Sequence, residues 1–479
     1  MTLFVFNTLS REKEKFVPLT PGFVGIYVCG PTVYGHSHLG HAKSYLSFDI
    51  IVRYLRYLGH RVRYVQNITD VGHLTDDTAE DKIAKQSRLE RLEPMEIVEK
   101  YTHSYFEDMD ALGLLRPDIS PRASAHIPEQ IRLIESLFEK GAAYESKGNV
   151  YFSIESFAPY GKLSGRKQED QEAGARVTID EGKRNPADFL LWRKASEEHI
   201  LQWDSPWGPG YPGWHLECSA MAMRYLGKTI DIHGGGLENQ FPHHESEIAQ
   251  SETVTGKQFA RYWIHNNMVT VNGQKMGKSL GNFVTLKDVF ERHHPSLIRF
   301  FLLRGHYRSQ VDYSEEAIHA ASSGLERIRA AYALAKEKSG TADEGDGALG
   351  RKADETKAAF LQAMDEDFNT PKALAATFEL VTAVNQAADP AGNTGGNEWL
   401  RVESFFEEEF RGVLGVVLEG EVSGGGLEPE LVELLLATRR DLRGEKNFAL
   451  SDKIRDGLLT IGIEIKDSKE GTAWKKKST

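Results

Sequence analysis

The fold follows from residues 22–68, which open with the run Gly-Phe-Val-Gly-Ile-Tyr-Val-Cys at 22–29. This short apolar run predicts a buried strand, and Gly30-Pro31 ends it. A turn rich in glycine and histidine follows, then a helical apolar pattern at about 42–58 and a second strand pattern at 61–68. A strand, a helix and a second strand make a βαβ unit, which implies a parallel sheet. Because ligands bind at the carboxyl ends of such strands, we expect the functional site near Cys29.

The rest of the chain divides into an irregular stretch, two more strands and a helical part. Residues 129–140 predict an amphipathic helix, and 143–213 predict an insertion that interrupts the sheet. Strand patterns resume at 229–233 and 262–271. Helical patterns then occupy 316–338, 355–388, 400–412 and 430–443, with glycine-rich linkers expected at 339–350 and 419–429.

Composition limits the class of protein. The chain has 479 residues, 40% of them hydrophobic and 27% charged, which is typical of a globular protein of about three domains. No long uncharged apolar window predicts a transmembrane helix, and residues 1–6 are too short an apolar start for a signal peptide. The net charge of −12 argues against a generic basic nucleic-acid binder but leaves room for local basic patches. With only two cysteines, we expect the reducing cytoplasm.

The first motif is His38-Leu39-Gly40-His41, between a strand end and a helix start. A helix N-terminus suits phosphate, because it presents free N–H groups and a positive dipole end. Imidazoles can donate hydrogen bonds to phosphate oxygens, and Gly40 allows a ligand to approach the backbone closely. The alternative is a histidine-rich turn without a function.

The second motif is Lys275-Met276-Gly277-Lys278-Ser279. Two lysines three residues apart in a glycine-containing loop can straddle a triphosphate, because each ammonium follows migrating negative charge. The alternative is an exposed lysine turn. The two motifs together, in this order, are a stronger signal than either alone.

The third group is Cys29, Cys218, His243 and Glu247. His243 and Glu247 share one face of a helix because they are four residues apart. Two thiolates, an imidazole and a carboxylate would make a tetrahedral zinc site, and His233, His244 and Glu245 could orient the ligands. The alternative is that both cysteines are packed core residues, because the sequence alone cannot bring Cys29 to Cys218.

Longer blocks resemble a known family. The first two motifs resemble the nucleotide-binding motifs of class I aminoacyl-tRNA synthetases, and further blocks resemble the cysteinyl-tRNA synthetases in particular. These blocks lie at 27–34, 213–221, 231–236, 241–247, 305–309, 367–371 and 471–474, so the resemblance covers nearly the whole chain.

The resemblance implies an α/β fold with a Rossmann-like parallel-sheet catalytic domain. We expect its first half at 1–118, a connective insertion at 119–205 and its second half, with the lysine loop, at 206–312. A helical bundle domain at 313–425 and a small anticodon-binding domain at 426–479 would follow.

The resemblance also implies a reaction and a site. Cysteine would be activated by ATP to cysteinyl-adenylate and then transferred to the 3′-terminal ribose of tRNA(Cys). One Zn²⁺ per chain would bind the four residues of the third group, and Mg²⁺ would accompany ATP. The catalytic and ATP-binding residues would be His38, Gly40, His41, Lys275, Lys278 and Ser279. Gly30, Thr32, Thr69, Trp214 and His233 match positions near the substrate cysteine. We expect a monomer that contacts tRNA but no membrane.

Two features depart from a simple match. The family has serine where this chain has Gly277, and we expect a working but more mobile loop. The acidic chain needs local basic contacts for tRNA, for which Arg439, Arg440, Arg443, Lys446 and 475–477 are candidates, and Trp474 could either stack on a base or anchor the tail.

Two other functions compete. One is a ligase that joins cysteine to an amino sugar, of the mycothiol type, by the same adenylate chemistry. Such relatives lack the tRNA-specific C-terminal region, and this chain has family-like blocks in 430–479. The other is a catalytically silent RNA-binding or zinc-sensing module, which would be expected to lose a histidine or lysine of the nucleotide motifs.

Overall fold

The computed structural model describes residues 2–71, 81–166, 182–196, 199–277, 280–340, 347–388, 394–419, 428–460, 462–468 and 471–476. They form two compact units, one of 1–291 and 295–420 and the other mainly of 421–479. Among the described residues no helix is long and apolar enough to span a membrane.

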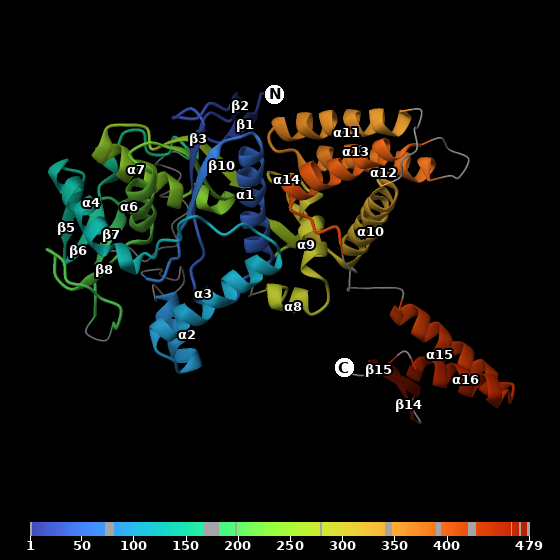
Figure 1. The fold of residues 1–479 in the computed structure, drawn as a ribbon. Coiled ribbons are helices and arrows are strands. Elements are labelled where there is room, and N and C mark those ends of the chain that lie inside the picture. The colour runs from blue at the N-terminus through green and yellow to red at the C-terminus, as the bar shows by residue number, and fades with distance from the viewer. Residues whose placement is uncertain are drawn as a thin grey trace. The chain divides into compact units, whose positions relative to one another are not determined.

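A four-stranded parallel sheet is the centre of the first unit (Figure 1). Its strands are β3 (Phe23–Val28), β4 (Arg61–Gln66), β9 (Ile230–Gly236) and β10 (Ala260–Asn266), in the order β10-β9-β3-β4. Helix α1 (Leu39–Tyr57) connects β3 to β4. The predicted βαβ unit and the α/β class are therefore confirmed.

The insertion is more regular than the sequence suggested. Helix α4 (Ile127–Glu139) is followed by an antiparallel sheet of β5 (Ala143–Ser146), β6 (Asn149–Phe152), β7 (Phe189–Lys194) and β8 (Gly210–Pro212). The interpretation of 143–213 as irregular was wrong for these strands, because strands of three to six residues between long connections show too few alternations to detect. Residues 167–181 and 197–198 lie outside the described part.

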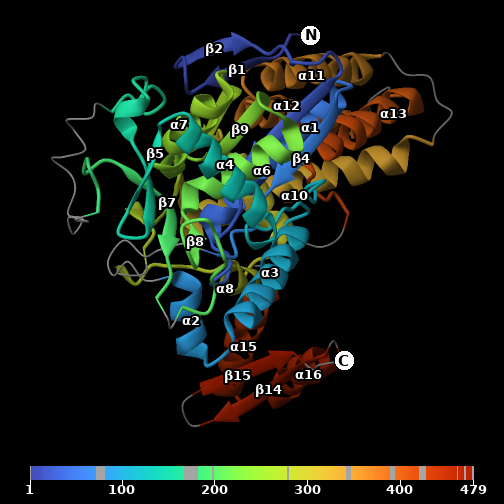
Figure 2. The same ribbon diagram turned by 90° about the vertical axis from the view of Figure 1, so that its left-hand side faces the viewer.

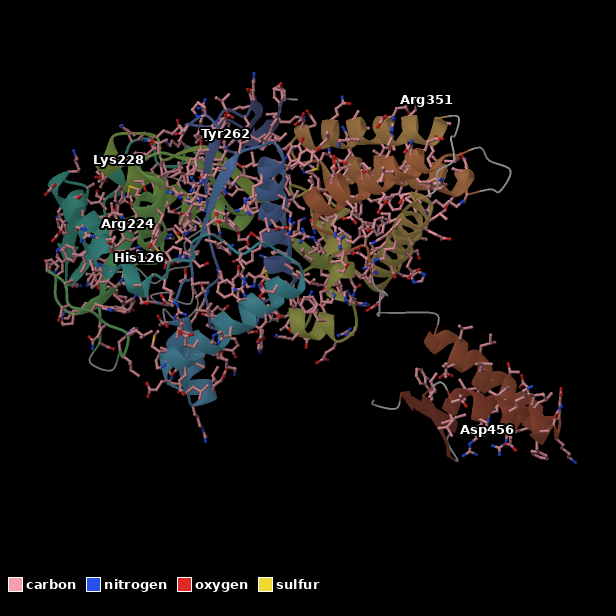
Figure 3. The ribbon with its side chains drawn as sticks, in the orientation of Figure 1. His126, Arg224, Lys228, Tyr262, Arg351 and Asp456 are labelled. Carbon is pink, nitrogen blue, oxygen red and sulfur yellow. The ribbon has the colours of Figure 1, made fainter. Side chains whose placement is uncertain are left out.

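The insertion has its own core. Phe152, Leu191 and Trp192 are fully buried there. His126, labelled in Figure 3, ties the start of α4 to the body, because its ring nitrogens bond the Arg122 carbonyl at 2.6 Å and the Tyr225 hydroxyl at 2.7 Å. Figure 2 views this side of the molecule, with β5, β7 and β8 beside α4 and α6.

The remaining elements surround the sheet. They are β1 (Phe4–Asn7), β2 (Glu12–Lys15), α2 (Lys82–Glu90), α3 (Pro94–Ala111), α6 (Trp214–Leu226), α7 (His243–Thr255), α8 (Leu286–Phe290) and α9 (Pro295–Leu303). A small sheet combines β11 (Val269–Val271), β12 (Gln274–Lys275) and β13 (Val311–Tyr313) in the order β12-β11-β13. The strand expected at 262–271 is thus two strands in different sheets.

Helices follow from residue 315, on the side of the sheet where α1 lies (Figure 1). They are α10 (Glu315–Lys338), α11 (Ala348–Asp365), α12 (Thr370–Ala387), α13 (Gly396–Phe405) and α14 (Gly412–Leu414), with a π-helical segment at Phe406–Arg411. The helical stretch expected at 355–388 contains two helices, α11 and α12, separated by a turn. Asp367 and Phe368 adopt left-handed backbone angles, with φ of 62° and 53°, and these separate α11 from α12.

The second unit contains α15 (Glu428–Gly444), α16 (Phe448–Thr460), β14 (Ile463–Ser468) and β15 (Gly471–Lys476). Val432, Leu436, Leu458 and Ile463 form its core. Arg439 is only 1% exposed, so it is not available as a tRNA contact. Trp474 packs against this core and its Nε1 donates to Glu433 Oε1 at 3.1 Å, which favours the anchoring interpretation.

Candidate active site

A cavity of about 540 Å³ opens at the carboxyl ends of β3, β4 and β9. Cys29 and Thr32 line it after β3, Asn67 and Thr69 after β4, and Gly236 at the end of β9. Parallel sheets bind ligands at this edge, where the N-termini of the crossover helices also meet. The cavity is therefore the candidate active site.

Four buried donor side chains meet at one end of this cavity. Cys29 follows β3, Cys218 lies on α6, and His243 and Glu247 lie one turn apart on α7. Their ligand atoms all lie within 4.8 Å of one another. Two thiols, an imidazole and a carboxylate are a donor set that binds zinc in proteins, so these residues fit that ion. The structure brings together the four residues that the sequence grouped.

The charge state of the donors also suits a cation. Burial raises the pKa of the Cys29 thiol, and it raises the pKa of Cys218 to about 11. Burial raises the pKa of Glu247 as well, although His233 opposes that shift. The charged forms of these donors are costly at a buried position unless a cation neutralises them. A metal site explains why three acidic donors are buried together.

Histidine side chains contact two of the four donor side chains. The Nε2 atom of His233 lies 2.8 Å from Glu247 Oε2, and that of His244 lies 3.2 Å from Cys29 Sγ. His244 Nδ1 in turn contacts His265 Nε2 at 2.7 Å. Partners of this kind orient metal ligands. His233 is completely buried and does not line the cavity, so it contacts the site through Glu247.

Glu245 is not part of this group. Its carboxylate accepts hydrogen bonds from the backbone N–H groups of Leu163 and Ser164. The residue therefore fastens the insertion to α7, and the expectation that it orients a ligand is wrong.

His38 and His41 start helix α1 and line the same cavity. His38 Nδ1 accepts from the Gly40 N–H at 3.1 Å, and His41 Nδ1 accepts from the His38 N–H at 3.4 Å. The two rings stack with centroids 3.9 Å apart. Burial and the neighbouring His38 lower the pKa of His41 well below its usual value, so its ring is neutral at pH 7. An accepting Nδ1 places the ring proton on Nε2, which is the donor that a phosphate oxygen needs.

The His38 ring leaves no space for a side chain at position 40. A Cβ atom there would lie 2.8 Å from Cε1 of His38. The space that the sequence assigned to an approaching ligand is thus occupied by the His38 ring, and glycine lets this ring cap the helix.

The lysine loop begins beside the same helix. Lys275 ends strand β12 and is exposed, and the Met276 side chain reaches to within 3.8 Å of where a Gly40 Cβ would lie. Asn282 clamps the loop, because its Oδ1 accepts from the Gly277 N–H at 2.9 Å and its Nδ2 donates to the Lys275 carbonyl at 3.1 Å. Lys278 and Ser279 lie outside the described residues.

Gly30, Thr32 and Trp214 line the cavity near the four donors. The Trp214 ring lies against His243, with centroids 4.2 Å apart and planes 30° from parallel. At Gly30 a Cβ would lie 1.6 Å from the Asn67 carbonyl oxygen, so only glycine fits between β3 and β4 there. These residues form a closely packed wall beside the candidate metal site.

Comparison with known proteins decides the family. Residues 15–323 match the model of the class I (C) tRNA synthetase catalytic domain, and 359–419 match the DALR domain. The chain is 55% identical to the cysteine–tRNA ligase of Chlorobium luteolum, over 99% of both chains. It is 48% identical to that of Deinococcus radiodurans, over 98% of this chain and 96% of the other. This chain belongs to the cysteine–tRNA ligase family.

Solved structures of two other tRNA synthetases share the fold of this family member. A Mycobacterium tuberculosis methionyl-tRNA synthetase in complex with methionyl-adenylate aligns with a TM-score of 0.59 at 15% identity, covering 82% of this chain and 90% of that one. A leucyl-tRNA synthetase from Agrobacterium radiobacter aligns with a TM-score of 0.58 at 13% identity, covering 83% and 85%. At these identities the likeness concerns the fold alone.

Sequence reasoning missed two polar residues at the candidate site: Asn67, which lines the cavity, and Glu217, which contacts it through Thr69. Asn67 Oδ1 accepts from the Gly30 N–H at 2.8 Å, and its Nδ2 donates to Thr69 Oγ1 at 3.0 Å. Thr69 Oγ1 donates to Glu217 Oε1 at 2.7 Å. Burial raises the pKa of Glu217 well above its usual value. The only signal in the sequence was position, since Asn67 ends a predicted strand and Glu217 precedes Cys218.

Proposed function

We propose that this chain activates L-cysteine with ATP and transfers the cysteinyl group to the 3′-terminal ribose of tRNA(Cys). The observation that carries the proposal is that a zinc-type donor set and a phosphate-type helix start lie in one cavity. The first would select the thiol of cysteine, and the second would hold the triphosphate. Family membership supports the same reaction.

The amino-acid end of the cavity would be built by Cys29, Cys218, His243 and Glu247, as ligands of one Zn²⁺. Bound zinc supplies a thiophilic Lewis acid, which favours a thiolate over the hydroxyl of serine. A purely apolar pocket separates near-isosteric side chains by only about 1–3 kcal/mol. Trp214 would form one wall of this end of the cavity.

Thr69 would orient the substrate ammonium group. Its hydroxyl hydrogen points to Glu217 and one lone pair is taken by Asn67, so an oxygen lone pair is left as an acceptor. Gly30 and Thr32 would complete the surroundings of the α-carbon. His233 would act indirectly, by fixing Glu247.

At the nucleotide end, the Nε2–H groups of His38 and His41 would donate to phosphate oxygens. Lys275 and Lys278 would neutralise the charge that builds up on the departing pyrophosphate, the Ser279 hydroxyl would bind ATP beside them, and Mg²⁺ would accompany ATP. A carboxylate oxygen of cysteine attacks the α-phosphorus, and the bond from that phosphorus to pyrophosphate breaks. A ribose hydroxyl then attacks the acyl carbon, loses its proton and displaces AMP.

The partners follow from this reaction. We propose that the chain acts as a cytoplasmic monomer and that the C-terminal unit contacts the anticodon. Arg440, Arg443 and Lys446 lie on or directly after α15 and are candidates for that contact.

The test is transfer of radiolabelled cysteine to unfractionated tRNA, with zinc measured in the same protein. We expect charging, one zinc per chain, and loss of both in Cys218→Ala. Ser251→Ala is the matched control, because its buried hydroxyl lies on α7 one turn beyond Glu247 and has no hydrogen-bond partner among the described residues. This control should keep zinc and charging.

Other outcomes separate the alternatives. Cysteine-dependent ATP–pyrophosphate exchange without charging would reject tRNA as acceptor and favour an amino sugar. Charging that survives complete removal of zinc would reject the metal site as the element that binds cysteine.

A further inference from the structure

The loop between α9 and β13, residues 304–310, touches three separate parts of the first unit. We call it the junction loop. It contains the block Gly305-His306-Tyr307-Arg308-Ser309, for which the proposed mechanism has no use.

The first link of the junction loop is to helix α1. Lys43 follows His41 by two residues, and its Nζ donates to the carbonyl oxygen of Ser309. Lys43 is only 2% exposed, and no carboxylate ion pair of Lys43 occurs among the described residues. The hydrogen bond from this buried lysine to a loop carbonyl ties the junction loop directly to the helix that begins with His38 and His41.

The second link is to the strand that leads to the lysine loop. Asn267 directly follows β10, its N–H donates to the Tyr307 carbonyl at 2.9 Å, and its Nδ2 donates to the Arg308 carbonyl at 3.0 Å. The chain then continues through β11 and β12 to Lys275. The junction loop therefore contacts both helix α1, which carries the histidine motif, and the segment after β10 that leads to the lysine motif.

The third link is to the helical part, through Asp367 in the turn between α11 and α12. Asp367 Oδ1 accepts from the Tyr307 hydroxyl at 2.6 Å, and Oδ2 accepts from Arg308 Nε at 2.7 Å. His306 Nε2 donates to the Asp367 carbonyl at 3.0 Å. Oδ1 also accepts from the Phe6 N–H at 2.9 Å, so strand β1 is held by the same carboxylate.

The turn that carries Asp367 is a strained one. Asp367 is 1% exposed, and both it and Phe368 have left-handed backbone angles. Aspartate tolerates this region, but a bulky aromatic residue adopts it only where its surroundings enforce it. The Asp367 N–H donates to the Phe4 carbonyl at 3.0 Å, and the Phe368 side chain is buried. The turn is therefore held in the one conformation that presents the carboxylate to the junction loop.

We propose that Asp367 is a positioning residue for the transfer step, because it fixes helices α11 and α12 to the junction loop and so to both nucleotide motifs. This inference rests on the proposed function. The transfer step needs the 3′ end of tRNA in the cavity. Within the first unit, Asp367 holds helices α11 and α12 against the loop that contacts α1 and the strand leading to the lysine loop.

The links predict which step depends on Asp367. Loss of its carboxylate cuts the helical link, whereas the bonds from Lys43 and Asn267 hold the loop against the nucleotide site. Cysteine activation needs no tRNA and should survive. Transfer to tRNA should not.

The experiment compares two assays on the full chain. In Asp367→Asn the amide N–H would face either the Phe6 backbone N–H or the Arg308 Nε–H, and neither can accept, so one bond must fail. We expect kcat for tRNA charging to fall at least about tenfold, while pyrophosphate exchange stays within about twofold. Asp365→Asn is the control, because Asp365 accepts from the Tyr54 hydroxyl at 2.8 Å and has no contact with the junction loop among those described. It should leave both rates unchanged.

A second variant keeps the test decisive if Asp367→Asn does not fold. Arg308→Lys retains the charge but removes the Nε donor, and the Arg308 side chain is 37% exposed, so folding should tolerate the change. Arg308→Lys should also lower tRNA charging while pyrophosphate exchange is kept. In the double variant, charging should be no lower than in Asp367→Asn alone.

Equal loss of exchange and charging, or loss of neither in folded protein, would overturn the inference. Both assays are run on the unmodified chain in parallel. If that chain fails to charge tRNA, the proposed function is rejected. If it charges and the variants charge equally well, only the role of Asp367 is rejected.

Discussion

Thr69 shows how much of the site depends on one hydroxyl group. Its oxygen links Asn67, which holds the Gly30 N–H, to Glu217, which precedes a candidate metal ligand. All three polar side chains are at most 1% exposed. Their hydrogen bonds cannot be replaced by water without opening the site, so the network fixes the geometry around the substrate.

Thr69→Val should therefore impair both substrate binding and stability. Valine has nearly the same shape but leaves Asn67 Nδ2 and Glu217 Oε1 without their bonds, at a cost of about 1–3 kcal/mol. We expect KM for cysteine to rise at least about tenfold in pyrophosphate exchange, with KM for ATP unchanged. Thr377→Val, which removes a buried hydroxyl bonded only to a carbonyl of its own helix, is the control. An unchanged KM for cysteine would contradict the role given to Thr69.

Gly277 is the position where the lysine loop departs from the family pattern. Its N–H is bonded to Asn282, which also binds the Lys275 carbonyl, so the backbone at this position is already clamped. Gly277→Ser should change the rate of adenylate formation by less than about tenfold, roughly 1.4 kcal/mol. The measurement is the pyrophosphate-exchange rate at saturating ATP. A larger increase would show that glycine weakens the loop.

At the scale of elements, burial of Lys43 lowers the stability of the fold, while its ammonium group holds the junction loop against α1. Burial lowers the pKa of Lys43 to about 8. The unfolded chain binds this proton more tightly, so the free energy of unfolding should rise with pH between about 8 and 10.5. The cost at pH 7 is on the order of 3 kcal/mol.

Lys43→Met should remove this cost and cut the link from α1 to the junction loop. We expect a higher melting temperature at pH 7 and a lower exchange rate at the same time. Between pH 8 and 10.5 the stability advantage of the variant over the unmodified chain should shrink as pH rises. Equal stability of the two proteins across this range would show that the ammonium group is not buried in solution.

The elements themselves were predictable to different degrees. The strands around 22–29 and 61–68 and the helix between them were found because a short apolar run ends at the Gly30-Pro31 breaker and a helical spacing of apolar residues separates it from the second strand pattern. The division of 355–388 into α11 and α12 was missed, although Asn369-Thr370-Pro371 is a helix-start signal: Asn369 caps α12 and Pro371 lies in its first turn. Tertiary contacts to β1 and the junction loop enforce the left-handed turn at Asp367 and Phe368, and no local pattern reports those contacts.

At the scale of the whole molecule, the two units have separate cores, so removal of one should spare the other. Truncation after residue 420 should leave cysteine-dependent pyrophosphate exchange within about twofold of the full chain. The efficiency of tRNA charging, kcat/KM, should fall at least about 100-fold, because the proposed anticodon contacts are lost. The two assays on the truncated and full-length proteins check this. A truncated chain that charges tRNA normally would show that the C-terminal unit does not bind it.

The sequence by itself determined the α/β class and the residue types that are grouped in the candidate site. These follow from local periodicity and from side-chain chemistry, which need only neighbouring residues. Only the tertiary structure decided that Cys29 and Cys218, 189 residues apart, face each other, that the His38 ring occupies the space beside Gly40, and that Asp367 reaches Tyr307 and Arg308. Such contacts depend on how the sheet, the insertion and the helices pack, and that packing is a property of the folded chain as a whole.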